Sequence, residues 1–152
     1  MALPAVGSPA PDFTLASTSR SDVTLSALRG KKVLLAFFPL AFTRTCTAEM
    51  CAFSEDYDKF QSRDTTVLPI SVDSVDTLVE FKRKENLAVD LLSDFKREVS
   101  RKYGTLIEER FYSGRAYVLI DRQGVVRWAF MEATPGSRRE NAEILEQLAK
   151  LS

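Results

Sequence analysis

Residues 33–38 form a continuous apolar run, Val-Leu-Leu-Ala-Phe-Phe, which Pro39 ends. A run of this length without polar residues at alternate positions is typical of a parallel strand that is covered on both faces. Such a strand requires a layer of structure on each side of its sheet. Even when it is extended to residue 42, the apolar segment is too short to span a bilayer and contains a proline.

Strand and helix patterns alternate along the rest of the chain. Short strands are expected at 12–15, 23–25, 66–72 and 91–93, and a hairpin at 116–120 and 125–130. Apolar residues recur every three or four positions, as in amphipathic helices, at 46–60, 75–81, 95–103 and 144–151. The sequence therefore predicts one α/β domain over residues 1–152, a central mixed β-sheet flanked by helices, with the thioredoxin fold as the best-fitting architecture.

Local signals mark several boundaries of these elements. Ser74 is expected to cap the helix that follows it, and Gly104 to stop the helix before it. Ser137 and Glu140 have the spacing of a capping box ahead of the last helix. Pro69 counts against a central position for the strand at 66–72, because proline has no N–H for the sheet.

Composition excludes several classes of partner and chemistry. Lys plus Arg and Asp plus Glu both number 21, which argues against nucleic acid or an anionic membrane as the main partner. The absence of histidine excludes Ser-His-Asp hydrolases, Cys-His proteases and His-bearing zinc sites. Two cysteines are too few for a thiolate metal cage, so no metal is expected. The N-terminal residues have no signal-peptide pattern, so a cytoplasmic protein is expected.

Cys46 is the main candidate for chemistry. It lies where the buried strand has ended and a helix begins, the usual place for a site in an open α/β sheet. In the first turn of a helix, the macrodipole and the free N–H groups stabilise a thiolate over a thiol. The alternative is structural, because Cys46 also falls on the apolar stripe of that helix and cysteine is commonly buried.

Several segments of the chain resemble the peroxiredoxin family. Pro39, Thr43 and Cys46 match its Pro-x-x-x-Thr-x-x-Cys pattern. Three further segments match in the expected order: the N-terminal arm at 10–15, a strand end at 71–73, and the arginine-bearing strand and turn at 115–124. The resemblance spans nearly the whole chain and implies a thiol-dependent peroxidase of the thioredoxin fold.

The resemblance assigns a role to each matching residue. Cys46 would attack the peroxide and become a sulfenic acid. Thr43 would hydrogen-bond the peroxide, Arg115 would hold the thiolate and polarise the oxygens, and Pro39 would shield the site from water. Glu49, on nearly the same helix face as Cys46, would support Arg115. The structural alternatives are a helix cap for Thr43, a solvated strand residue for Arg115, a strand stop for Pro39 and an exposed glutamate for Glu49.

Cys51 follows Cys46 by five positions. This spacing resembles the bacterioferritin comigratory protein (peroxiredoxin Q) subgroup, in which that cysteine resolves the sulfenic acid as a disulfide. Residues 37–43 resemble AhpE-type members, some of which lack the second cysteine, so the chain lies between the two subgroups. Five helical residues place the two Cα atoms about 8–9 Å apart, whereas a disulfide requires about 7 Å or less. A disulfide between them would therefore require the first turn of the helix to unwind. The alternatives are a one-cysteine peroxidase and a merely buried Cys51.

The resemblance also implies the partners. They are a hydroperoxide substrate and an external thiol reductant, thioredoxin or a related carrier, with no cofactor, since sulfur carries both electrons. A homodimer through the loops around the site is consistent with the AhpE-like segment. Two rival functions remain: a thiol–disulfide oxidoreductase, for which the Cys spacing is wrong, and a non-enzymatic redox-sensing module of the same fold.

Overall fold

The structure is a computed structural model that describes residues 2–134 and 136–151. Its elements, in chain order, are β1 (Thr14–Ser17), β2 (Asp22–Thr24), the 3-10 helix η1 (Leu25–Leu28), β3 (Lys32–Phe37), α1 (Arg44–Glu55), α2 (Tyr57–Gln61), β4 (Thr65–Ser71), α3 (Val75–Glu85), β5 (Leu92–Ser93), α4 (Glu98–Lys102), β6 (Leu106–Ile107), β7 (Tyr112–Ser113), β8 (Ala116–Ile120), β9 (Val126–Met131) and α5 (Asn141–Leu148).

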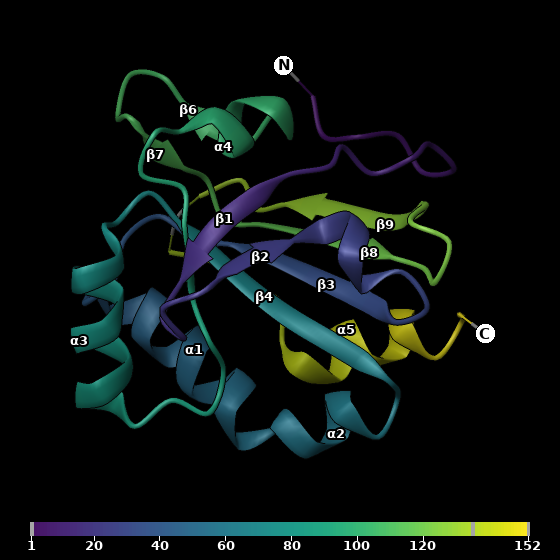
Figure 1. Cartoon of the computed structure of the whole chain (residues 1–152), viewed down its shortest axis with the longest axis horizontal. Coiled ribbons are helices and arrows are strands. Elements are labelled where there is room, and N and C mark those ends of the chain that lie inside the picture. Colours follow the sequence, from purple (N-terminus) through teal and green to yellow (C-terminus); the bar gives the residue numbers. More distant parts are fainter. Residues whose placement is uncertain (1, 135, 152) are drawn as a thin grey trace.

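β3 lies inside a seven-stranded mixed sheet of order β2-β1-β5-β4-β3-β8-β9 (Figure 1). It runs parallel to β4 and antiparallel to β8, and every one of its residues is buried. Alternate residues of a strand point to opposite faces. Accordingly, Leu34 and Ala36 join one core cluster, whereas Val33, Leu35 and Phe37 join the other. The expected strand buried on both faces is therefore present.

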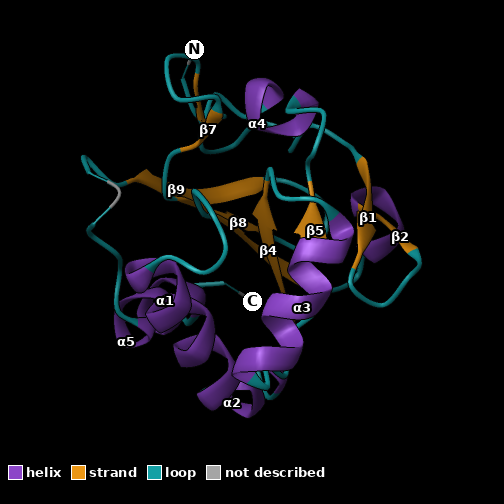
Figure 2. Cartoon of the chain, turned by 90° about the vertical axis from the view of Figure 1, so that its left-hand side faces the viewer, coloured by secondary structure: helices purple, strands orange, loops and turns teal. Residues whose placement is uncertain are grey.

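Helices cover the two faces of the sheet unequally. α1, α2, α3 and α5 contribute buried residues to the cluster that contains Leu34 and Ala36. α4, η1 and the N-terminal arm contribute to the other cluster. Figure 2 shows α1, α3 and α5 gathered on one side, with α4 on the other. Among the described residues, none of the helices combines the length and the apolar character that crossing a membrane requires.

Pro69 occupies an interior strand, which the sequence argument disfavoured. β4 lies between β3 and β5, and Pro69 is opposite Ala36 in the register. The carbonyls of Asp64 and Ile70, both even-numbered, accept hydrogen bonds from the backbone N–H groups of Lys32 in β3 and of Phe38 just after it. In a strand with a neighbour on each side, alternate residues bond to alternate neighbours, so the backbone N of the odd-numbered Pro69 points away from β3 and toward β5. β5 pairs with β4 only at Ile70 and Ser71. The missing N–H therefore costs β4 no bond to β3.

Several boundary predictions are wrong. The helix expected over 95–103 is only α4, and Phe95 lies outside it and is exposed. The helix expected over 46–60 is broken at Asp56 into α1 and α2. At this break, Asn141 Nδ2 of α5 donates to the Ala52 carbonyl, at 2.8 Å, and to the Asp56 carboxylate, at 3.0 Å. The capping box is also wrong, because α5 begins at Asn141 and the Ser137 hydroxyl bonds Thr134 instead.

Other local signals are confirmed. The Ser74 side chain accepts a hydrogen bond from Thr77 N and caps α3. Gly104 follows the end of α4 with a φ of 71°, a conformation that glycine adopts without strain. β8 and β9 pair as the expected hairpin, and Gly124 N donates to the Asp121 carbonyl in the turn between them, at 3.0 Å. The short hairpin of β6 and β7 was not predicted.

Candidate active site

The segment after β3 is held against the end of β4. Ala41 N donates to Asp73 Oδ2, at 2.8 Å, and the Ser71 hydroxyl donates to the same oxygen, at 2.7 Å. Phe42 has a φ of 67°, which is rare for a residue with a side chain. Asp73 was not predicted as a site residue, although the sequence marked 71–73 as a strand end. Its carboxylate fixes the turn that leads into α1.

Cys46 is buried in the first turn of α1. Thr43 occupies the N-cap position, but its side chain makes no capping bond; its hydroxyl donates to the Leu40 carbonyl, at 2.8 Å. The alternative of a helix cap therefore holds for the position of Thr43 but not for its side chain. Its hydroxyl proton is already engaged, so its oxygen is free to accept a hydrogen bond from a ligand.

Arg115 reaches Cys46 from the residue before β8. Its Nη2 lies 3.1 Å from Cys46 Sγ, and its Nη1 lies 2.8 Å from Glu49 Oε1. The side chains of Arg115 and Glu49 are only 1% and 2% exposed. The readings of Arg115 as solvated and of Glu49 as exposed are therefore wrong. One guanidinium therefore donates a hydrogen bond to the cysteine and another to the glutamate.

Tyr117 completes this cluster, and the sequence analysis missed it. Its hydroxyl donates to Glu49 Oε2, at 2.7 Å. The signal for it was present, because residues two apart on a strand share a face, so Tyr117 lies on the same side of β8 as Arg115. Nothing in the spacing indicated that a glutamate from α1 would meet it there.

Burial and charge act together on these groups. Burial raises the pKa of Glu49, while Arg115 and the Tyr117 hydroxyl act in the opposite direction. Burial also opposes the charge on Arg115, but the charges of Glu49 and Cys46, together with the hydrogen bonds to both, raise the pKa of Arg115. Burial, followed by the charge of Glu49, raises the pKa of Tyr117. Arg115 and Tyr117 therefore hold their protons and act as donors.

A hollow of about 230 Å³ opens beside Cys46. Its lining includes the four residues that carry the sequence resemblance, together with Tyr112: Pro39, Thr43, Cys46, Tyr112 and Arg115. Pro39 is buried there. The structure thus brings together Pro39, Thr43, Cys46 and Arg115 around one space, with Glu49 behind Arg115.

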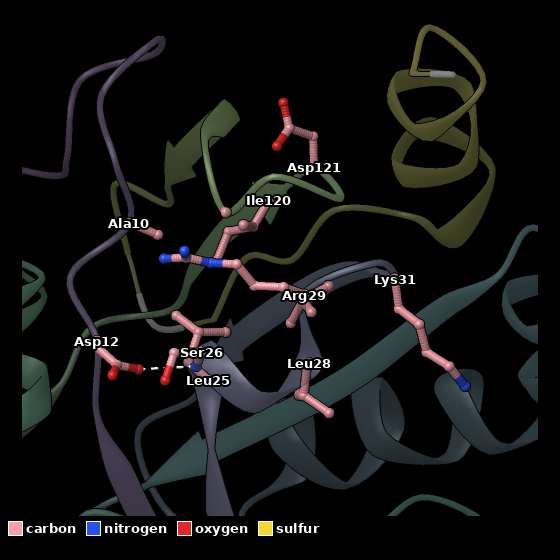
Figure 3. A pocket seen from close by; sticks show the side chains of 11 residues that line it. Ala10, Asp12, Leu25, Ser26, Leu28, Arg29, Lys31, Ile120 and Asp121 are labelled. Carbon is pink, nitrogen blue, oxygen red and sulfur yellow. Dashed lines mark hydrogen bonds between the residues drawn. The ribbon is translucent and has the colours of Figure 1, made fainter.

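A second hollow lies at the opposite end of β3 (Figure 3). Arg29 reaches between Ala10 and Ile120, and the Asp12 carboxylate accepts a hydrogen bond from Ser26 N. This space measures only about 20 Å³, and no cysteine lines it. It is therefore a poor candidate for thiol chemistry.

Cys51 lies on the same helix as Cys46 but does not line the hollow. Both cysteines are free, and Cys51 is half-buried. Its Sγ is 3.9 Å from Glu85 Oε1 of α3. Burial, the charges of Glu85 and Glu55 and this hydrogen bond raise the pKa of Cys51. With α1 intact, the second thiol lies apart from the Arg115 cluster.

Comparisons with known proteins agree with the fold and the sequence pattern. Residues 6–129 match the model of the AhpC/TSA family. The chain is 37% identical over 150 residues to alkyl hydroperoxide reductase E of Mycobacterium tuberculosis, covering 97% of each chain. It is 40% identical over 127 residues to the putative peroxiredoxin bcp of Coxiella burnetii, covering 80% of this chain and 84% of that one. The reduced 2-Cys peroxiredoxin of Plasmodium vivax superposes with a TM-score of 0.89 at 34% identity, over 95% of this chain and 80% of that one.

Proposed function

This chain belongs to the AhpC/TSA family of peroxiredoxins and is a thiol-dependent peroxidase of the thioredoxin fold, and we propose that Cys46 is its peroxide-reducing residue. The observation that carries the proposal is the 3.1 Å contact between Arg115 Nη2 and Cys46 Sγ at a hollow. A guanidinium only donates hydrogen bonds, so the sulfur accepts, as a thiolate nucleophile would.

The proposed reaction transfers two electrons from sulfur to the peroxide. The Cys46 thiolate attacks one peroxide oxygen, the S–O bond forms as the O–O bond breaks, and the departing oxygen takes a proton to leave as water or an alcohol. Cys46 becomes a sulfenic acid. Negative charge spreads from sulfur toward the departing oxygen, so the donors of Arg115 stabilise this transition state more than the ground state.

Thr43 and Pro39 are proposed to position the peroxide. The Thr43 hydroxyl proton points to the Leu40 carbonyl, so its oxygen is oriented to accept from the O–H of a hydroperoxide. Pro39 offers no N–H to water and lines the same hollow. Glu49 is proposed to orient Arg115 through its 2.8 Å contact.

We propose that Cys51 resolves the sulfenic acid. Its thiol attacks the Cys46 sulfur, a disulfide forms, and the oxygen leaves as water. An external dithiol, thioredoxin or a similar carrier, then reduces the disulfide and is itself oxidised. The position of both cysteines on α1 supports this pairing, as does the similarity to the Coxiella burnetii protein. Both sulfurs cannot meet across an intact helix, so α1 must unwind before the bond forms.

The remaining expectations concern assembly and location. A homodimer is supported by the exposed rings of Phe42 and Phe111, which stand one position before the hollow-lining residues Thr43 and Tyr112. Burying these rings against a second copy would shield the site from water. The cytoplasmic location stays a prediction.

Rapid mixing with hydrogen peroxide tests the role of Cys46. The Cys46 thiol should disappear with one equivalent of peroxide, much faster than an ordinary free thiol reacts. Cys46→Ser should abolish this reaction and keep the fold, because a hydroxyl is a far weaker nucleophile than a thiolate. Cys51→Ser is the matched control and should keep the first oxidation step. Turnover that survives in Cys46→Ser would place the nucleophile at Cys51, and ordinary thiol rates in the wild type would favour a redox-sensing module.

A further inference from the structure

The Tyr117 hydroxyl lies between two partners with a defined direction of donation. The backbone N of Arg139 lies 2.9 Å from the hydroxyl oxygen, and an N–H can only donate. The hydroxyl proton is therefore directed to Glu49 Oε2, 2.7 Å away. Tyr117 is fully buried, so water does not compete for either bond.

The same direction of donation continues to the cysteine. Glu49 Oε1 accepts from Arg115 Nη1, and Arg115 Nη2 donates to Cys46 Sγ. The orientation of the guanidinium thus depends on the orientation of a carboxylate. That carboxylate has two oxygens, and Tyr117 bonds the one that Arg115 Nη1 does not.

We propose that Tyr117 is a positioning residue for peroxide reduction: its hydroxyl holds the Glu49 carboxylate so that Arg115 stays aimed at Cys46. The proposal rests on the proposed function of Cys46. Tyr117 does not line the hollow, so it acts through Glu49 and not on the peroxide.

The surroundings of Tyr117 keep its hydroxyl in place. Its ring stacks on Trp128, with centroids 6.1 Å apart and an interplanar angle of 26°. The Arg139 side chain bonds Glu132 at 2.7 Å and Glu143 at 3.1 Å. These contacts fix the residue whose N–H sets the direction of the Tyr117 proton.

Replacing Tyr117 by Phe keeps the ring and removes only the hydroxyl. Glu49 then keeps the neighbouring charges of Arg115 and Arg138 but loses its second hydrogen-bond donor. A buried carboxylate that loses a hydrogen bond takes up a proton more readily or turns toward another donor. Either change loosens the bond between Glu49 and Arg115, and the reaction at Cys46 should slow.

The test is the rate of Cys46 oxidation in Tyr117→Phe, measured by rapid mixing with hydrogen peroxide from pH 5 to pH 8. We expect a fall of about tenfold at pH 7, which corresponds to about 1.4 kcal/mol. We also expect the acid side of the rate profile to move to higher pH, because losing the donor raises the pKa of Glu49 further. A rate and a profile equal to those of the wild type would overturn the proposal.

Glu49→Gln shows whether Tyr117 acts through Glu49. In that background, adding Tyr117→Phe should change the rate by less than about twofold, since the carboxylate is already gone. A second tenfold loss in the double variant would overturn the proposal.

Tyr103→Phe is the matched control. Tyr103 is equally buried, donates its hydroxyl to the Pro11 carbonyl at 2.6 Å, and packs in the core cluster on the other face of the sheet. Urea unfolding should show a loss of stability in both variants, because each loses the bonds of a buried hydroxyl, while only Tyr117→Phe slows oxidation. Equal slowing in Tyr103→Phe would reduce Tyr117 to a structural role. Failure of the proposed function has a different signature, because Cys46→Ser would then still reduce peroxide.

Discussion

Cys46 and Cys51 lie on one continuous helix, yet their sulfur atoms face groups of opposite charge. Arg115 Nη2 donates to Cys46 Sγ at 3.1 Å, whereas Cys51 Sγ lies 3.9 Å from the Glu85 carboxylate. A carboxylate beside a thiol opposes its ionisation, and after burial the charge of Glu85 is the next cause that raises the pKa of Cys51. The two thiols of α1 therefore lie in different electrostatic surroundings.

Arg115→Lys should slow the oxidation of Cys46 by at least about tenfold, or roughly 1.4 kcal/mol. Lysine keeps a charge but loses the planar fork that bonds Cys46 and Glu49 at once. Rapid mixing with hydrogen peroxide measures the rate. Arg101→Lys, at an exposed ion pair with Glu108, is the control and should match the wild type. An unchanged rate in Arg115→Lys would place Arg115 outside the reaction.

Oxidised wild type should contain one intramolecular disulfide, seen by mass spectrometry as a loss of two mass units. Amide exchange over residues 45–51 should rise at the same time, because the bond cannot form across an intact helix. Cys51→Ser should still reduce one equivalent of peroxide and then accumulate sulfinic acid at high peroxide. If the oxidised wild type instead gains only the mass of added oxygen, or forms a disulfide between two chains, the protein is a one-cysteine peroxidase.

Glu85→Gln should make Cys51 react faster with an alkylating agent. Burial comes first among the causes that raise the pKa of Cys51, and the charge of Glu85 adds to it. Removing that charge lowers the pKa, so more thiolate is present at a given pH. In a Cys46→Ser background at pH 8, we expect alkylation to rise about two- to fivefold. Glu80→Gln, on the same helix but paired with Arg83, should have no effect. Equal alkylation rates in Glu85→Gln and Glu80→Gln would show that the Glu85 carboxylate does not act on Cys51.

Asn141→Ala should lower the free energy of unfolding by about 1–3 kcal/mol at pH 7. The hydrogen bond from Asn141 is the largest cause that lowers the pKa of Asp56. A depressed carboxyl pKa contributes stability above its unfolded value and loses it as the pH falls through the folded value. The difference between wild type and Asn141→Ala should therefore shrink below about pH 4.

Urea unfolding at pH 7 and pH 3 measures that difference. Gln147→Ala, another amide on α5, is the control and should stay within about 0.5 kcal/mol of the wild type at both values. If Asn141→Ala loses the same free energy of unfolding at pH 7 and at pH 3, the Asp56 charge plays no part in the effect.

Much of the fold could be predicted because its signals are local. The apolar run at 33–38 and the alternation of elements indicated a covered mixed sheet, and Ser74 and Gly104 marked true helix ends. The break at Asp56 could not be predicted in this way. It is accompanied by bonds from Asn141, 85 positions away, and helical periodicity is unaffected by so distant a partner.

The candidate site divides in the same way. By itself, the sequence singled out Pro39, Thr43, Cys46 and Arg115 through the resemblance to the peroxiredoxin pattern, and local spacing placed only the first three of them on one segment. Only the tertiary structure decided what bonds to them. Glu49 and Tyr117 meet across 68 positions of chain, and Cys51 meets Glu85 across 34. Such contacts depend on how α1 packs against β8 and α3, and packing is set by all the buried surfaces together, which no spacing within one segment records.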